Sequence, residues 1–91
     1  MTTGRGDGVA RIAVVDDVVD RSVRLALDLS PAFVLVRDFS LHEDLGVDSF
    51  QLMAIVVNIE IELGVEFEPD ALTSLETIGD LIRVANAMAL P

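Results

Sequence analysis

Three residue types that often shape a fold or carry its chemistry are absent from this sequence of 91 residues: cysteine, tryptophan and tyrosine. Without cysteine, the chain can form neither a disulfide framework nor a thiolate metal site. Positive charge is also scarce, because six arginines and no lysine face sixteen acidic residues, for a formal net charge of -10 at pH 7. Scattered arginines cannot neutralise a row of phosphates, so the composition argues against nucleic acid and favours a partner with a basic patch.

Long uninterrupted apolar runs are missing as well. The most apolar stretch, Phe50–Leu63, is too short to span a membrane and contains one asparagine and two glutamates. The N-terminal region has Arg5 and Arg11 but lacks the apolar core of a secretory signal before Asp16. We therefore expect a cytoplasmic protein that does not interact with membranes.

The composition is otherwise that of a small folded domain, since 52% of the residues are hydrophobic and only 4% are aromatic. A chain of this length buries roughly 60 to 65% of the surface that its unfolded form exposes, which is enough for one core. We expect a single domain over residues 1–91, with a disordered tail at 1–8 and a helical bundle at 16–89. Residues 9–15 form either an extra turn or a docked arm. A monomer is the expected oligomeric state.

The prediction of the fold starts from the stretch between Leu45 and Leu63. Gly46 can take a positive φ, and Asp48 and Ser49 precede a long run of helix-compatible residues, so we expect a loop that turns into a helix at Ser49. Helical spacing puts two apolar stripes on nearly opposite faces of this helix. The first stripe is Leu52, Ile55, Val56, Ile59 and Leu63, and the second is Phe50, Met53, Ala54, Val57 and Ile61. The second stripe is either packed inside the protein or available to a partner.

The segment before this helix is predicted to hold a first helix and a long loop. The helix begins between Val9 and Asp17, with Asp16 as a candidate N-cap, and runs to about Leu29, where Ser30-Pro31 stops it. The loop, at residues 32–47, has apolar side chains that would pin it over the ends of the helices. A short strand at 34–36 is the alternative, although no second strand is evident to pair with it.

The segment after the central helix is predicted to add two more helices. Gly64 supplies a C-terminal cap, Pro69 at a first helical position marks a short third helix, and Thr77 with Asp80 forms a capping box for the fourth. The predicted fold class is all-α: a small four-helix bundle with three longer helices, one short third helix and a long loop between the first two.

The residue types needed for unaided catalysis are missing. His42 is the only histidine and lies seven residues before Ser49, which does not support a nucleophile triad. The run His42-Glu43-Asp44 lacks the spacing of a calcium loop and allows at most loose cation binding. No glycine-rich phosphate loop is found. We therefore expect no catalytic residue and no metal site.

Ser49 is the residue placed for a covalent modification. At the start of a helix, unpaired N–H groups and a partial positive charge favour a phosphate attached to its hydroxyl oxygen. The alternative is that Asp48 or Ser49 is only the N-cap, which is the commoner meaning of Asp-Ser before a helix. These two residues alone do not separate the hypotheses.

The run Glu43-Asp44-Leu45-Gly46-Val47-Asp48-Ser49 resembles the modification site of the acyl carrier proteins. Three later segments also look like that family: Gly64-Val65-Glu66-Phe67, Pro69-Asp70 and Thr77-Ile78-Gly79-Asp80-Leu81. The resemblance therefore covers about residues 16–89. The resemblance implies a four-helix carrier whose Ser49 receives 4′-phosphopantetheine from coenzyme A through a separate, magnesium-dependent phosphopantetheinyl transferase. The thiol of this arm would tether acyl, aminoacyl or polyketide intermediates as thioesters, so the protein would be a non-catalytic carrier.

The resemblance also implies roles for the neighbours of Ser49. Asp48 would cap the helix and help the transferase to recognise the site. Loading enzymes, synthases and transferases with basic and apolar patches would dock on the start and exposed face of the second helix. This docking surface maps onto Phe50, Gln51, Met53, Ala54, Val57 and Glu60.

Departures from the family bear on the pathway. Carriers of primary fatty acid synthesis usually have acidic residues two and five positions after the serine, where this chain has Gln51 and Ala54, and Phe50 replaces the usual leucine. A less acidic, aromatic docking face favours a carrier of one specialised pathway, polyketide-like or nonribosomal-peptide-like. The alternatives are a carrier of primary fatty acid synthesis and an unmodified helical interaction module of the same fold.

Overall fold

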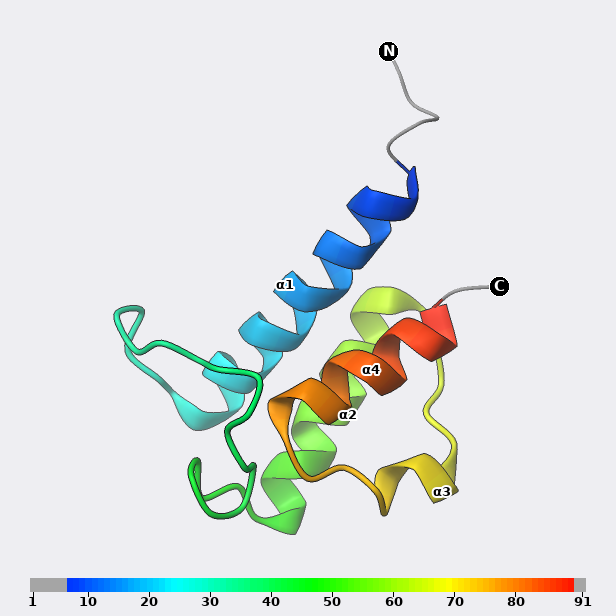
Figure 1. Ribbon diagram of the computed structural model, residues 1–91. Coiled ribbons are helices and arrows are strands. Elements are labelled where there is room, and N and C mark those ends of the chain that lie inside the picture. Colours follow the sequence, from blue (N-terminus) through cyan, green and yellow to red (C-terminus); the bar gives the residue numbers. More distant parts are fainter. Residues whose placement is uncertain (1–6, 90–91) are drawn as a thin grey trace.

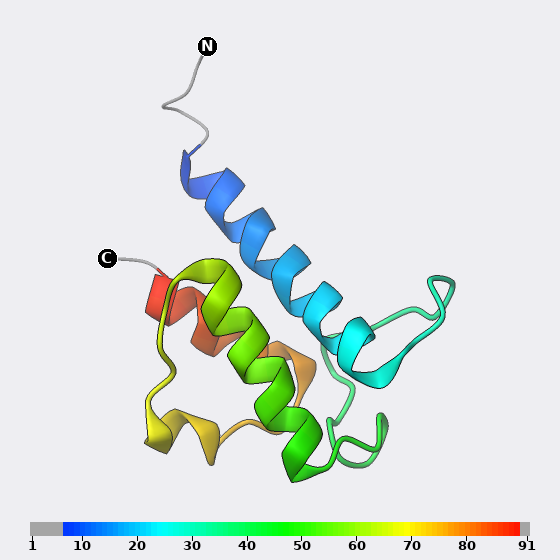
Figure 2. The same ribbon diagram turned by 180° about the vertical axis from the view of Figure 1, so that it is seen from behind.

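The computed structural model describes residues 7–89, with side chains from residue 15 onward, as four helices joined by loops (Figure 1). In chain order the helices are α1 (Asp7–Leu27), α2 (Ser49–Leu63), α3 (Pro69–Leu72) and α4 (Ile78–Ala89). α1 and α2 lie side by side and run in opposite directions, as both views show (Figure 2), and α4 packs against α1. The predicted all-α fold with its short third helix is confirmed. Within residues 7–89 the β-type pairing is one isolated bridge between Ser40 and Thr77, so the alternative strand at 34–36 is wrong.

The first helix starts earlier than the candidate cap indicates. α1 begins at Asp7, inside the predicted tail, and Asp16 lies within the helix, so its assignment as the N-cap is wrong. The rest of that tail lies outside the described residues. The residue before the candidate cap, Val15, is completely buried, so the apolar face of α1 extends beyond Asp16 toward the N-terminus. Residues 9–15 are therefore an extension of the helix and not a separate arm.

α2 keeps its two apolar stripes apart, as helical spacing predicts. The buried members of the first stripe are Ile55, Val56 and Ile59. We call the second stripe the outer stripe; its members are Phe50, Met53, Ala54, Val57 and Ile61. All of these side chains are exposed, Phe50 by 82% and Ile61 by 73%. The sequence left open whether this stripe is packed inside the protein or exposed. Within the described residues it is exposed to solvent.

A polar seam fixes how α1 lies along α2. The amide group of Asn58 donates a hydrogen bond to the Ser22 hydroxyl at 2.6 Å, and Ser22 is only 2% exposed. One turn further along α2, Glu62 pairs with Arg21. A buried polar group without a partner costs about 1 to 3 kcal/mol, so sliding one helix past the other is unfavourable. The seam therefore holds α2, and the residue at its start, in one register against α1.

The loop between α1 and α2 is held by the start of α4. The N–H groups of Ile78 and Gly79 donate to the carbonyl oxygens of Phe39 at 3.1 Å and Arg37 at 2.9 Å. The first N–H groups of a helix have no partner within that helix, so the loop supplies acceptors for them. These bonds place the middle of the loop against the N-terminus of α4.

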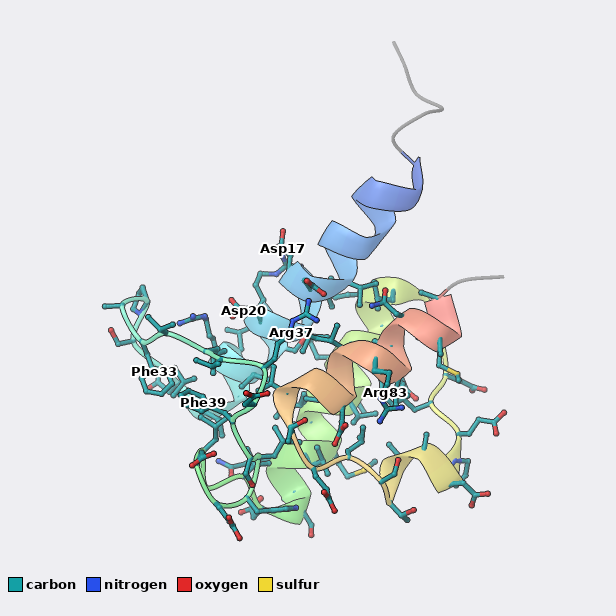
Figure 3. All side chains as sticks on the ribbon, in the orientation of Figure 1. Asp17, Asp20, Phe33, Arg37, Phe39 and Arg83 are labelled. Carbon is teal, nitrogen blue, oxygen red and sulfur yellow. The ribbon has the colours of Figure 1, made fainter. Side chains whose placement is uncertain are left out.

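The apolar side chains of the loop pin it to the core at several points. Leu41 and Val47 are buried, at 0% and 2% exposure, and Leu35, Phe39 and Leu45 are partly buried against the core. The pinning prediction is wrong only for Phe33, Val34 and Val36, which are exposed. Figure 3 shows Phe33 beside Phe39 at the edge of the molecule, with their ring centroids 6.1 Å apart. The fully buried anchors, Leu41 and Val47, both lie in the half of the loop that leads into Ser49.

The predicted capping box at the start of α4 is confirmed. The Thr77 hydroxyl accepts a hydrogen bond from the Asp80 N–H, and Asp80 Oδ2 accepts from the N–H groups of Thr77 and Glu76. The other carboxylate oxygen pairs at 3.1 Å with Arg83, which Figure 3 labels. The Glu76 N–H has the largest effect on the pKa of Asp80 and, together with Arg83 and Thr77, holds it below the ordinary value of 3.8, although partial burial acts in the opposite direction.

Asp80→Asn is expected to lower the free energy of unfolding by about 1 kcal/mol at neutral pH. A carboxylate whose pKa is lowered by folding stabilises the protein above its unfolded-state pKa, and this contribution is lost as the pH falls through the folded-state pKa. The difference between parent and variant should therefore narrow from about pH 4 downward. Denaturation curves across the acid range measure it. Asp38→Asn is the control, because Asp38 is an exposed loop residue that forms no ion pair within the described residues. A difference that stays constant with pH would contradict the expectation.

Candidate functional site

Ser49 is the first residue of α2 and its side chain is exposed. Among the hydrogen bonds of the described residues, none uses the Ser49 hydroxyl. The cap of α2 is made instead by Asp48, whose Oδ1 accepts a hydrogen bond from the Gln51 N–H at 2.7 Å. The sequence left open whether Asp48 or Ser49 is the N-cap of α2. The structure assigns the cap to Asp48, and the Ser49 hydroxyl does not take part in it.

Gln51 completes this cap from the other side. Its Oε1 accepts a hydrogen bond from the Asp48 N–H at 3.1 Å, which makes Asp48 and Gln51 a reciprocal capping box. The resemblance assigned Gln51 only to docking, so this structural role was missed. The signal was present, because an acceptor residue followed three positions later by glutamine is the pattern of a capping box.

The last residues of the loop direct the chain into α2. Gly46 has a φ of 68°, in the left-handed region that glycine adopts without a clash at Cβ. Val47 is buried, and its N–H donates to the Leu41 carbonyl at 2.7 Å. The Val47 carbonyl accepts a hydrogen bond from His42 Nδ1, also at 2.7 Å. Both the side chain and the backbone of the residue two positions before Ser49 are therefore fixed.

The start of α2 fits a phosphate group. The N–H groups of Ser49 and Phe50 have no backbone acceptor within the described residues, and the first turn of α2 contains no acidic residue. These amides carry the partial positive charge of a helix N-terminus. A phosphoester on the Ser49 oxygen would be stabilised by them.

Around this site the chain is acidic. Between Arg37 and Arg83 there is no lysine or arginine, whereas carboxylates recur throughout. The arginines with described side chains form ion pairs, namely Arg21 with Glu62, Arg24 with Asp20, Arg37 with Asp16 and Arg83 with Asp80. Figure 3 shows Arg37 near Asp20, and both line a cleft at α1. The segment that contains Ser49 therefore combines negative charge with the apolar outer stripe.

The side chains of the remaining candidates, His42 and Asp44, form local contacts with the backbone of the loop. His42 donates to the Val47 backbone, and Asp44 Oδ2 accepts a hydrogen bond from the Ser40 N–H. Among the side chains that the structure describes, no group of three or more histidine, cysteine or acidic residues could hold a metal ion. Nor does any helix in the described range combine the length and apolar character needed to cross a bilayer.

The predicted docking residues divide into two sets. Phe50, Met53, Ala54 and Val57 lie together on the outer stripe. Gln51 belongs to the cap of α2, and the Glu60 carboxylate accepts a hydrogen bond from the Phe67 N–H at 2.7 Å. Ile61, which sequence reasoning placed in the stripe but not in the docking set, extends the exposed apolar surface by one turn.

Comparison with known proteins identifies the family. The model of a family described as the phosphopantetheine attachment site matches residues 22–85. The acyl carrier proteins of Arthrobacter sp. (strain FB24) and Paenarthrobacter aurescens (strain TC1) are each 43% identical over 79 residues, which is 86% of this chain and 91% of each relative. A solved structure described as an acyl carrier protein from Mycobacterium tuberculosis shares the fold, with a TM-score of 0.75 and 18% identity over 80% of this chain and 96% of that one.

The family match spans most of the chain, including α2 and the residues on either side of it. The curated relatives match over nearly their whole length, and the backbone at the start of α2 has free amide groups that would stabilise a phosphoester. The chain belongs to the acyl carrier protein family and carries 4′-phosphopantetheine as a covalently attached prosthetic group.

Proposed function

We propose that Ser49 is the residue to which 4′-phosphopantetheine is attached. The observation that carries this proposal is that Asp48 makes the cap of α2, while the Ser49 hydroxyl is exposed and has no partner within the described residues. In the transfer from coenzyme A, the Ser49 oxygen forms a bond to the phosphorus that bears pantetheine, and the pyrophosphate bond breaks. 3′,5′-ADP leaves, and the hydroxyl proton passes to a base of the transferase.

Asp48 has two roles in this proposal. Its carboxylate caps α2 and so fixes the backbone from which the Ser49 hydroxyl projects. It also belongs to the segment 43–49 that the magnesium-dependent phosphopantetheinyl transferase recognises. The transferase supplies the catalytic groups, and this chain supplies a fixed nucleophile.

The protein then acts as a non-catalytic, monomeric carrier in the cytoplasm, formed by a single domain. Bound to Ser49, the arm supplies a thiol that holds acyl, aminoacyl or polyketide intermediates as thioesters. The residues of the chain itself present this arm and dock the partner enzymes. Because the tether confines the intermediate near each docked enzyme, it raises the effective concentration of substrate there.

The outer stripe, with Gln51 and Glu60 at its flank, is the docking surface in this proposal. Phe50, Met53, Val57 and Ile61 follow one another at helical spacing on the exposed face of α2, which suits an apolar groove on a partner. Basic residues at the rim of that groove would match the carboxylates of the surrounding segment. The partners are the transferase, an acyl- or aminoacyl-loading enzyme, and synthases.

The pathway served is a specialised one, polyketide-like or nonribosomal-peptide-like. Support comes from the first turns of α2, where Gln51 is held in the cap and Ala54 is apolar, so that Glu60 is the first acidic residue within the helix. A partner that docks here relies mainly on apolar contacts, whereas a partner whose surface is complementary to an acidic face gains less binding free energy. Primary fatty acid synthesis is the alternative, and it predicts efficient exchange with its synthase enzymes.

Incubation with coenzyme A, magnesium and a broad-specificity phosphopantetheinyl transferase should add one phosphopantetheinyl group to the parent protein and none to Ser49→Ala. Intact mass measures the addition. Because the chain has no cysteine, a thiol assay gives an independent readout, rising from zero to one thiol per chain on loading.

Ser74→Ala is the matched control, since Ser74 is another exposed serine but bonds to the Ala71 carbonyl in the turn after α3. This variant should load as the parent does. Uptake by Ser49→Ala would assign the attachment to another residue, and a well-folded parent that takes up nothing would favour the unmodified interaction module.

Val57→Glu should raise the KM of the transferase for the carrier about tenfold or more, because it puts a charge in the middle of the outer stripe where an apolar contact is expected. The side chain is 43% exposed, so thermal stability should change little. Leu25→Glu is the control, as Leu25 of α1 is 73% exposed and lies outside the stripe. Equal effects of the two substitutions would argue against the outer stripe as the docking surface.

A further inference from the structure

Side chains hold the peptide group between Val47 and Asp48 from both sides. Its carbonyl oxygen accepts a hydrogen bond from His42 Nδ1 at 2.7 Å, and its N–H donates to Gln51 Oε1 at 3.1 Å. A carbonyl oxygen can only accept, so Nδ1 of His42 carries a proton. Two bonds at opposite ends of one peptide plane fix the rotation of that plane.

This rotation determines how the chain enters α2. The neighbouring groups are already fixed, because the Val47 side chain is buried and its N–H donates to Leu41. Asp48 follows with φ at -94° and ψ at 178°, and its carboxylate caps the helix. If the Val47 carbonyl turned away from His42, the dihedral angles on either side of the plane would change. The cap and the Ser49 hydroxyl would then shift together.

His42 makes this contact from the surface of the protein. Its side chain is exposed and lines an open cleft of about 370 Å³ together with Ser40, Glu43, Glu76 and Thr77. Loss of an exposed ring opens no cavity in the core, so it should alter local geometry more than stability.

We propose that His42 is a positioning residue for the loading of Ser49. Through the Val47–Asp48 peptide, it keeps the hydroxyl in the orientation that the transferase requires for attack on phosphorus. It acts on the backbone and not on the reacting atoms, and it is not a general base. This inference rests on the proposal that Ser49 is the attachment residue.

Loading kinetics with coenzyme A, magnesium and the transferase test this role. His42→Ala should lower kcat about threefold to tenfold, as expected for the loss of one hydrogen bond in the reacting geometry. The KM for the carrier should stay within about twofold, because the outer stripe is unchanged. His42→Asn should recover at least about half of the parent kcat, since the asparagine amide can donate from nearly the place of Nδ1. Val34→Ala, at an exposed residue elsewhere on the loop, should match the parent.

Several outcomes would overturn the inference. These are an unchanged kcat in His42→Ala, a rise in KM alone, which would make His42 a docking residue, and a lack of rescue by asparagine. A fall in Tm of more than about 10 °C with parallel loss of loading in both variants would make it a folding residue. If the parent protein loads and His42→Ala loads with the same kinetics, only this inference is refuted. A parent that does not load refutes the proposed attachment and this inference together.

The protonated nitrogen provides a readout that does not depend on loading. Nitrogen-15 NMR of the imidazole ring in the full chain should show the neutral form with its proton on Nδ1. Free histidine prefers the proton on Nε2, so the expected spectrum reports the bond to the Val47 carbonyl. A neutral ring protonated on Nε2 in the folded protein would overturn the proposal.

Discussion

The amide groups at the start of α4 are the constraint on which the loop, and through it the carrier site, depends. A helix cannot satisfy its own first N–H groups. In this protein the amides of Ile78 and Gly79 take carbonyls of the loop, while the two preceding amides take the Asp80 carboxylate. The loop is thereby fixed shortly before the turn that leads into Ser49. The N-terminus of α4 thus helps to position the N-terminus of α2, which precedes it in the chain.

Charge and apolar surface act together on the exposed face of α2. An open stripe of five apolar residues would favour self-association in a neutral protein. With a net charge of -10, copies of the chain repel one another, whereas a basic partner is attracted. The arginines with described side chains are already paired with carboxylates, so they add little to attraction between copies. Electrostatic repulsion therefore disfavours contact between two copies at this stripe and favours contact with a basic partner.

Features with a local chemical signal could be predicted from the sequence, including the two faces of α2, the capping box of α4 and the proline that starts α3. The start of α1 could not, because Asp16 is a good cap residue by type, yet the chain is already helical from Asp7 and buries Val15 just before that residue. The exposure of Phe33 was missed for a related reason, since composition does not show how far a loop can reach. The attachment motif around Ser49 was evident, but the contact between His42 and the Val47 carbonyl follows from the path of the loop and has no sequence pattern.

The cap of α2 is made by Asp48 and not by Ser49, and this bears on how other proteins would recognise the carrier. Since Asp48 makes the cap, attachment of the arm at Ser49, as proposed, would break no hydrogen bond within the described residues. On this ground the bundle is expected to keep the same scaffold with and without the arm. An enzyme that distinguishes a loaded carrier from an empty one would then contact the arm and its cargo directly. Under this proposal, discrimination between the two forms would depend on ligand recognition more than on a conformational change of the bundle.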